Sequence, residues 1–197
     1  MFKLTPIVID NWYSKEELDN IFLELDYYQK TAPIKSAQDY CAETLDKKPK
    51  AKAFRMYPGS FWQPEQRDMS FILRYQKKFR EPTFHRKIES ISNIYDLFWQ
   101  TNQDFTMISY YNKSDYYKRH NDLVKYTALI WVYKEPKQFE GGDLIFNDLN
   151  KTIECKNNRL VLFPGFLYHE VTKINSNKKI KDGYGRYCIT HFYNYAD

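Results

Sequence analysis

The chain has 197 residues, enough for one domain with a substantial hydrophobic core. Its net charge is only +5 and its lysines are spread along the chain, so the composition gives no reason to expect a nucleic-acid-binding protein. The lack of a long apolar run, of a signal-like start and of closely paired cysteines argues against a membrane protein, a secreted protein and a disulfide scaffold, and predicts a cytoplasmic one.

The N-terminal part of the chain begins with a short strand and an amphipathic helix. Residues 5–9 predict the strand, and a capping box of Ser14 and Glu17 predicts where the helix begins. The apolar residues of this helix fall on one face and are Leu18, Ile21, Phe22, Leu25 and Tyr28. Residues 30–66 are polar and interrupted by prolines, which predicts either a loop that covers a substrate or a plain surface excursion.

Two further helical stretches follow, at residues 65–79 and 82–99. The second stretch carries apolar residues at alternating spacings of four and three, which is typical of a helix that lies against a sheet. These residues are Phe84, Ile88, Ile91, Tyr95 and Phe98. We interpret them as part of the hydrophobic core and not as a binding site.

After Asn102 the chain changes to short segments that are rich in β-branched and aromatic residues. The predicted strands are residues 105–111, 125–133, 143–146, 159–163, 168–173 and 185–193. Helices followed by strands predict an α+β fold, with helices packed on one sheet of an antiparallel jelly roll whose mouth could hold a site. We expect one domain over residues 1–197, helical to about residue 103 and with a jelly-roll core at about 104–197.

A candidate metal site consists of His120, Asp122 and His169. In an extended segment His120 and Asp122 point to the same side, because side chains alternate with a period of two. His169 lies in the segment 163–171, which joins two strand-like runs and can easily hold an inward-facing ligand. Each piece alone has an ordinary structural explanation. Together, two imidazoles and one carboxylate are the ligand set of non-haem Fe(II) oxygenases, which leaves one face of the metal open.

Arg186 is a candidate anion-binding residue on the last predicted strand. It shares one face of that strand with Cys188 and Thr190. An arginine that points into an aromatic interior is costly unless an anion pairs with it, and its planar fork suits a carboxylate. Thr190 could add a hydroxyl donor to the same ligand. An ordinary surface arginine is the alternative interpretation.

Several motifs follow one another in an order that resembles a known family. They are Tyr110, Tyr117, His120-Asn121-Asp122, the aromatic strand 127–133, the segment 139–144, the strand 160–163, His169-Glu170-Val171 and Arg186-Tyr187-Cys188-Ile189. Residues 105–193 thereby resemble the 2-oxoglutarate- and Fe(II)-dependent oxygenases, and within them the prolyl 4-hydroxylase-like branch. The family resemblance implies a double-stranded β-helix, the cupin-like form of the jelly roll.

The resemblance also implies roles for individual residues. It implies that His120, Asp122 and His169 bind Fe(II) and that Arg186 binds the distal carboxylate of the cosubstrate 2-oxoglutarate. The further pocket-lining candidates are Tyr110, Thr190 and Trp131. O2 is the other cosubstrate and ascorbate is a candidate reductant. No side chain beyond the metal ligands is expected to be catalytic.

Three features depart from the family pattern or narrow it. The stretch between His169 and Arg186 is longer than usual, and its excess at about 175–184 is polar and lysine-rich and predicts an extended hairpin loop. Phe192 stands where nucleic-acid-demethylating relatives have a second arginine, which argues against that branch. The carboxylate of Asp122 argues against a halogenase, in which a small residue frees a position for halide.

The resemblance favours an enzyme that hydroxylates an unactivated C–H bond, with release of succinate and CO2. The first hypothesis is a peptidyl hydroxylase that acts on proline or another residue of a protein or peptide. The alternative is a hydroxylase of a small molecule or free amino acid on the same scaffold, because kinship in fold does not determine the substrate. A more remote alternative is a non-catalytic jelly-roll binding module. No nucleic-acid or membrane partner is expected.

Overall fold

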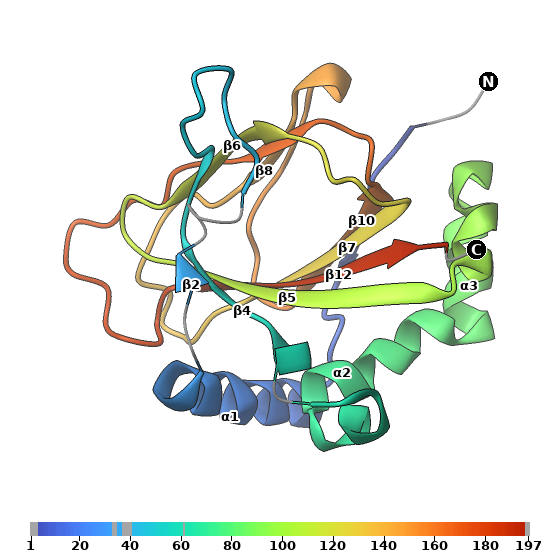
Figure 1. The fold of residues 1–197 in the computed structure, drawn as a ribbon, viewed down its shortest axis with the longest axis horizontal. Coiled ribbons are helices and arrows are strands. Elements are labelled where there is room, and N and C mark those ends of the chain that lie inside the picture. Colours follow the sequence, from blue (N-terminus) through green and yellow to red (C-terminus); the bar gives the residue numbers. More distant parts are fainter. Residues whose placement is uncertain (1–3, 33–34, 37–40, 61, 196–197) are drawn as a thin grey trace.

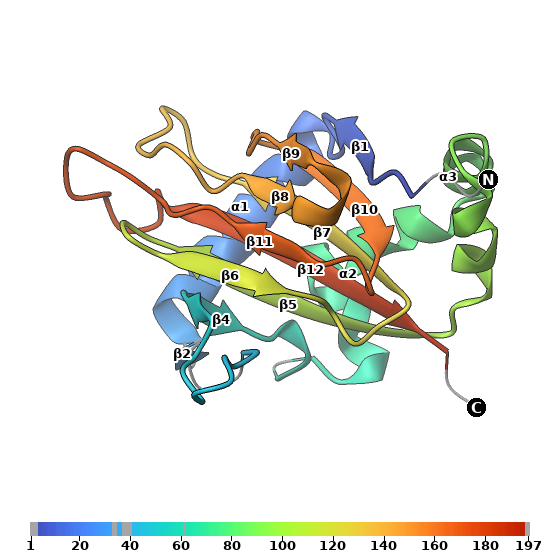
Figure 2. The same ribbon diagram turned by 90° about the horizontal axis from the view of Figure 1, so that it is seen from above.

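The structure is a computed structural model that describes residues 4–32, 35–36, 41–60 and 62–195. In these residues two antiparallel sheets lie face to face (Figures 1 and 2). The larger sheet has the order β1 (Ile7–Asp10), β10 (Arg159–Pro164), β7 (Tyr126–Val132), β12 (Arg186–Asn194), β5 (Gln103–Tyr111), β4 (Phe54–Met56) and β2 (Lys35–Ser36). The smaller sheet has the order β3 (Ala51–Lys52), β6 (Tyr116–His120), β11 (His169–Val171), β8 (Leu144–Phe146) and β9 (Lys151–Ile153).

Helices cover the outer face of the larger sheet. Figure 1 shows α1 and α2 beneath this sheet and α3 towards one end of it. The helical elements are α1 (Lys15–Thr31), α2 (Phe71–Tyr75), α3 (Pro82–Glu89) and the 3-10 segments η2 (Pro58–Ser60), η3 (Pro64–Met69), η4 (Gln76–Arg80), η5 (Asn93–Gln100) and η6 (Asn147–Leu149). The predicted α+β class, with helices packed on one sheet, is confirmed.

Alternation along the strands divides the core into two layers. In β7, Ala128 and Ile130 face the helices, whereas Leu129 and Trp131 face the smaller sheet. All four are buried, which explains why this strand is a continuous apolar run. The layer between the sheets is therefore closed on the helix side by packed side chains, and a site inside it must open elsewhere.

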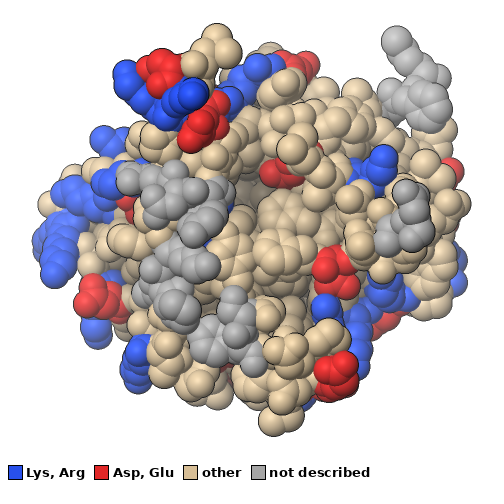
Figure 3. All heavy atoms as spheres, in the orientation of Figure 1, with Lys and Arg blue, Asp and Glu red and all other residues tan. Residues whose placement is uncertain are grey.

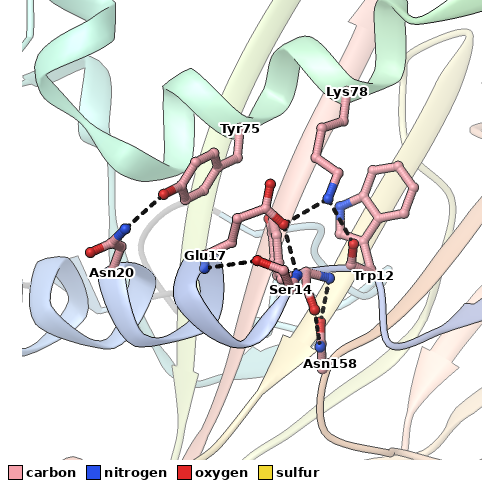
Figure 4. Close-up of polar contacts among 8 residues, drawn as sticks. Trp12, Ser14, Glu17, Asn20, Tyr75, Lys78 and Asn158 are labelled. Atoms are coloured by element: carbon pink, nitrogen blue, oxygen red, sulfur yellow. Dashed lines mark hydrogen bonds and ion pairs between the residues drawn. The ribbon is translucent and has the colours of Figure 1, made fainter.

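The junction between α1, η4 and the turn before β10 is held by polar contacts (Figure 4). Ser14 Oγ accepts the Glu17 N–H at 3.2 Å and the Glu17 carboxylate accepts the Ser14 N–H at 2.7 Å, which confirms the predicted capping box. Lys78 Nζ donates to the same Glu17 carboxylate at 2.7 Å. The side chain of Asn158 accepts from the Tyr13 N–H and donates to the Tyr13 carbonyl. These contacts fix α1 against the larger sheet.

The helical prediction for residues 82–99 is correct in part. The segment is broken into α3 and η5, and Ile91 in the gap between them is 41% exposed instead of buried. The other four members of the predicted stripe are buried in the helix-side layer. The α-helix ends at Glu89, so the helical phase is lost before Ile91 is reached.

Residues 30–66 contribute more to the sheets than their polar sequence indicates. The strands β2 and β4 extend the larger sheet beside β5, and β3 pairs with β6 in the smaller sheet. The part of this segment at 33–34, 37–40 and 61 lies outside the described residues. The predicted division of the chain into a helical part and a jelly-roll part near residue 103 is therefore wrong, since both sheets use strands from before it.

None of the helices described is both long and apolar enough to cross a membrane.

Candidate metal centre

His120, Asp122 and His169 meet at one end of the smaller sheet. His120 ends β6, His169 begins β11, and the two residues are direct partners in the antiparallel pairing of these strands. Asp122 Oδ1 lies 3.8 Å from His120 Nε2, and Asp122 Oδ2 lies 3.7 Å from His169 Nε2. The three ligand atoms lie within 4.8 Å of one another, a spacing that one metal ion can span.

Hydrogen bonds from the backbone fix the orientation of both imidazoles. His120 Nδ1 lies 2.9 Å from the Lys118 carbonyl, and His169 Nδ1 lies 2.9 Å from the Leu167 carbonyl. A carbonyl can only accept, so each Nδ1 carries the proton and each Nε2 presents a lone pair towards Asp122. This is the arrangement by which proteins orient metal-binding histidines.

The surroundings keep His120 neutral. Burial lowers the pKa of His120 to about 3, with a further contribution from the neighbouring His169. The ring of Tyr117 stacks on it in a nearly parallel orientation, with 3.5 Å between the ring centroids. Asp122 Oδ2 accepts a hydrogen bond from Thr127 Oγ1 at 2.6 Å, which holds the carboxylate in place. Two oriented imidazoles and one oriented carboxylate fit Fe(II).

A cavity of about 260 Å³ leads from the metal-binding residues into the space between the sheets. Its lining includes all three candidate ligands and, from β12, Arg186, Cys188, Thr190 and Phe192. Ser109, Tyr111 and Thr127 add polar groups from β5 and β7. The side chain that was predicted to bind an anion and the three predicted metal ligands therefore share one cavity.

Arg186 has the properties of an anion-binding residue. Its residue exposure is 1%, and its Nε and Nη1 atoms are buried without a hydrogen-bond partner in the described structure. The guanidinium carbon lies 4.2 Å from the ring centroid of Tyr111 and 5.8 Å from that of Trp131. Aromatic faces stabilise the charge but offer no lone pair to the N–H groups of these two nitrogens. A dicarboxylate with one end at Arg186 would satisfy them, so the pocket fits 2-oxoglutarate.

Gly142 makes room for this arginine. Its φ is +77°, and a Cβ atom on it would lie 2.8 Å from Arg186 Cδ and 2.7 Å from Ile174 Cδ1. A side chain at this position would be strained by its own backbone and would displace the guanidinium. The double glycine at 141–142 therefore has a structural reason beyond the turn, because the second glycine determines where Arg186 lies.

The predicted pocket-lining residues have different positions. Thr190 lines the cavity, and its hydroxyl lies 3.5 Å from Cys188 Sγ. Trp131 is fully buried between the sheets near Arg186 but is not part of the cavity lining. The prediction for Tyr110 is wrong, because its side chain packs in the helix-side layer and its hydroxyl accepts the Gly185 N–H at 3.0 Å. The adjacent Tyr111 points into the cavity instead.

Tyr111 and Arg55 are among the cavity residues that were not identified from the sequence. Tyr111 is the register partner of Arg186, so correct pairing of β5 with β12 would have placed both on the inner face. Arg55 belongs to β4, within the segment 30–66 that the sequence predicts to be irregular. It is buried in the cavity, and its guanidinium lies 5.5 Å from the ring centroid of Tyr117. No pattern in the sequence indicates that β4 borders the cavity.

The outer part of the cavity is aromatic. Tyr57 and Phe105 have ring centroids 5.6 Å apart, and Phe105 and Phe192 are stacked at 6.2 Å. All three line the cavity, and Phe105 is 50% exposed. Figure 3, which looks into the space between the two sheets, shows a hollow whose walls are mostly neither acidic nor basic. These rings line the same cavity as the candidate metal ligands.

Residues 106–194 match the family model of the 2OG-Fe(II) oxygenase superfamily. None of the curated protein sequences matches this chain significantly. Similar solved structures include a viral collagen prolyl hydroxylase from Paramecium bursaria Chlorella virus-1 in complex with 2OG, with 14% identity and a TM-score of 0.58. They also include a Trichoplax adhaerens prolyl hydroxylase in complex with a peptide fragment of hypoxia inducible factor, with 16% identity and a TM-score of 0.63.

These likenesses extend over nearly the whole chain. The viral structure covers 98% of this chain and 97% of its own, and the Trichoplax structure covers 98% and 84%. A Pseudomonas putida prolyl-4-hydroxylase has 12% identity, a TM-score of 0.54 and coverage of 98% and 93%. At this level of identity the likeness shows the fold, and it confirms the predicted jelly-roll core.

Proposed function

Since residues 106–194 of this chain belong to the 2OG-Fe(II) oxygenase superfamily, we propose that the protein is a 2-oxoglutarate-dependent dioxygenase that hydroxylates an unactivated C–H bond. The observation that carries this proposal is the single cavity that joins the His120, Asp122 and His169 cluster to Arg186, whose Nε and Nη1 have no hydrogen-bond partner in the described structure. The strands before residue 103 complete both sheets, so we also propose that residues 1–197 act as one domain.

The side chains bind and orient, while the difficult chemistry belongs to the cofactor. Bound Fe(II) would supply the activation of O2, with the decarboxylation of 2-oxoglutarate to succinate and CO2 providing two electrons. His120, Asp122 and His169 would hold the metal and leave its other positions open. Arg186 would bind the distal carboxylate of the cosubstrate, and Thr190, four residues further along β12 on the same face, would donate a further hydrogen bond.

We propose a prolyl or other residue of a protein or peptide as the substrate. The aromatic lining formed by Tyr57, Phe105 and Phe192 supports this, because extended proline-rich segments bind to aromatic grooves. A Trichoplax prolyl hydroxylase of the same fold is seen with a peptide. The second candidate is a small carboxylic acid or free amino acid, which the buried Arg55 of the same cavity favours, since a guanidinium can bind a carboxylate.

Mass spectrometry with defined substrates tests the proposal. The protein is incubated with Fe(II), 2-oxoglutarate, O2 and ascorbate as reductant, with either a peptide library or a set of free amino acids. We expect a mass gain of one oxygen atom on a peptide, succinate in equal amount, and neither product from Asp122→Ala. Oxygen gain on free amino acids alone would select the second candidate. Absence of both metal binding and succinate would revive a non-catalytic binding module and contradict the proposal.

A further inference from the structure

The segment of residues 172–185, which joins β11 to β12 and contains the lysine-rich insertion, is fixed to the end of the barrel where β12 begins (Figures 1 and 2). The N–H of Ile174 donates to the Asp115 carbonyl at 2.9 Å, and its carbonyl accepts the Ser114 N–H at 2.9 Å. Asn175 and Glu140 exchange two backbone hydrogen bonds of 2.9 Å. The first residues of the segment are therefore hydrogen-bonded to neighbouring loops of the two-sheet core and do not begin a free hairpin.

Further along, the insertion is tied to the loop that follows β7. Ser176 Oγ donates to the Gln138 carbonyl at 2.8 Å, and the Lys181 N–H donates to Gln138 Oε1 at 3.0 Å. The Tyr184 N–H then donates to the Lys181 carbonyl at 2.9 Å. Gln138 therefore holds both sides of the insertion against the same end of the barrel.

Two isoleucines of this polar segment are fully buried. Ile174 and Ile180 have an exposure of 0%, and both belong to the apolar cluster between the sheets. Ile174 lies close to the Arg186 side chain without lining the cavity itself, because a Cβ on Gly142 would meet both Ile174 Cδ1 and Arg186 Cδ within 3 Å. Lysine-rich loops place their side chains in water, so burial of two isoleucines at this position needs a reason.

We propose that residues 172–185 form a plug that closes the Arg186 end of the barrel, so that 2-oxoglutarate binds its arginine without competition from water. This inference rests on the proposed function. A carboxylate–guanidinium pair is far stronger in a site from which water is excluded than in a hydrated one. Arg186 has no access to bulk solvent at its Nε and Nη1 atoms, and the isoleucines of the plug belong to the same apolar cluster as Tyr111 and Trp131, whose rings flank its guanidinium. The insertion thus sets the cosubstrate affinity without touching the metal ligands.

Binding measurements on the full-length protein loaded with Mn(II), which replaces the reactive metal, test the plug. The variants Ile174→Ala and Ile180→Ala open it, and Ile21→Ala is the matched control, because Ile21 is equally buried but lies on the helix side of the larger sheet. We expect the Kd of 2-oxoglutarate to rise about tenfold or more in the plug variants, as the pair becomes hydrated, with no change in the control. The Kd of Mn(II) should stay the same in all of them.

A second variant avoids any loss of core packing. Gln138→Ala with Ser176→Ala removes the two side-chain tethers at the surface and should weaken 2-oxoglutarate binding in the same direction. Equal cosubstrate affinity in the wild type, this double variant and any folded isoleucine variant would overturn the plug and leave the proposed function standing. Failure of the wild-type protein with Mn(II) to bind 2-oxoglutarate would overturn the proposed function, and the plug with it.

Discussion

Burying a guanidinium whose nitrogens lack hydrogen-bond partners lowers the stability of the folded protein. Because the net stability of proteins is small, such a group is expected to have a function. Arg186 is such a group, and it lies between aromatic rings in the cavity that holds the candidate metal ligands. The cost is offset when a carboxylate fills the site. If Arg186 binds 2-oxoglutarate as proposed, the residue links the stability of the folded chain to the presence of that ligand.

Replacement of Arg186 by Gln should weaken 2-oxoglutarate binding about tenfold to a hundredfold, because a charged hydrogen bond contributes about 1.5–3 kcal/mol. The metal ligands are untouched, so the Kd of Mn(II) should not change. Calorimetric titration of the cosubstrate into metal-loaded protein measures both. An Arg186→Gln variant that binds 2-oxoglutarate as tightly as the wild type would remove this residue from the site.

The neighbours Tyr110 and Tyr111 allow a matched comparison, since they lie on opposite faces of β5. Tyr111→Leu removes a ring that stacks on Arg186 and should raise the Kd of 2-oxoglutarate severalfold. Tyr110→Phe removes one hydrogen bond to Gly185 and should lower the free energy of unfolding by about 0.5–1.5 kcal/mol without changing that Kd. The opposite pattern would restore the prediction made from the sequence for Tyr110.

At the scale of elements, the carboxylate of Glu24 joins α1 to the segment that leads into α2. Glu24 is buried on α1 and accepts hydrogen bonds from Tyr28 Oη at 2.6 Å, from Ser70 Oγ and from the Ile72 N–H at 2.9 Å. Ser70 is also the N-cap of α2. One side chain therefore fixes both where α2 begins and how it packs on α1.

Glu24→Ala should lower the free energy of unfolding by about 2–4 kcal/mol, because three buried donors lose their acceptor. Urea unfolding followed by circular dichroism measures the change. The exposed Glu16 on the same helix provides the control, and Glu16→Ala should have an effect within about 0.5 kcal/mol. A loss at Glu24 as small as at Glu16 would show that this junction does not stabilise the fold.

For the whole molecule, pH dependence of stability should include a contribution from His191, which is fully buried between the larger sheet and Phe79. Burial lowers its pKa to about 3, Arg67 lowers it further and Asp104 opposes the shift. The ordinary value near 6.5 applies to the unfolded chain. Below that pH His191 binds a proton in the unfolded chain but not in the folded chain. The free energy of unfolding therefore falls as the pH drops from about 6.5 towards 3.

Between about pH 7 and about pH 5 this single group should cost about 2 kcal/mol of the free energy of unfolding. His191→Gln keeps a polar partner for Thr106 but does not titrate, so its stability should fall less over the same interval. Urea unfolding at the two pH values measures the difference between wild type and variant. Parallel losses in both proteins would show that His191 does not contribute.

Features that depend on interactions between residues close in sequence could be predicted, whereas features that depend on the pairing of distant segments could not. The capping box of Ser14 and Glu17 and the strand alternation are local, so they were predicted correctly. The position of Tyr110 depends on the pairing of β5 with β12, and a shift of one residue moves a side chain to the opposite face. The role of Arg55 depends on β4, a three-residue strand without periodicity, whose place is fixed by its partner β5.

The central claim is that three side chains distant in sequence hold one metal ion, and metal titration tests it most directly. Addition of Fe(II) without oxygen, followed by calorimetry, should give one site per wild-type chain. His120→Ala, Asp122→Ala and His169→Ala should each lose it, while His85→Ala, which changes a histidine of α3, should keep it. A wild-type chain that binds no Fe(II), or a His169→Ala variant that binds it unchanged, would contradict the account.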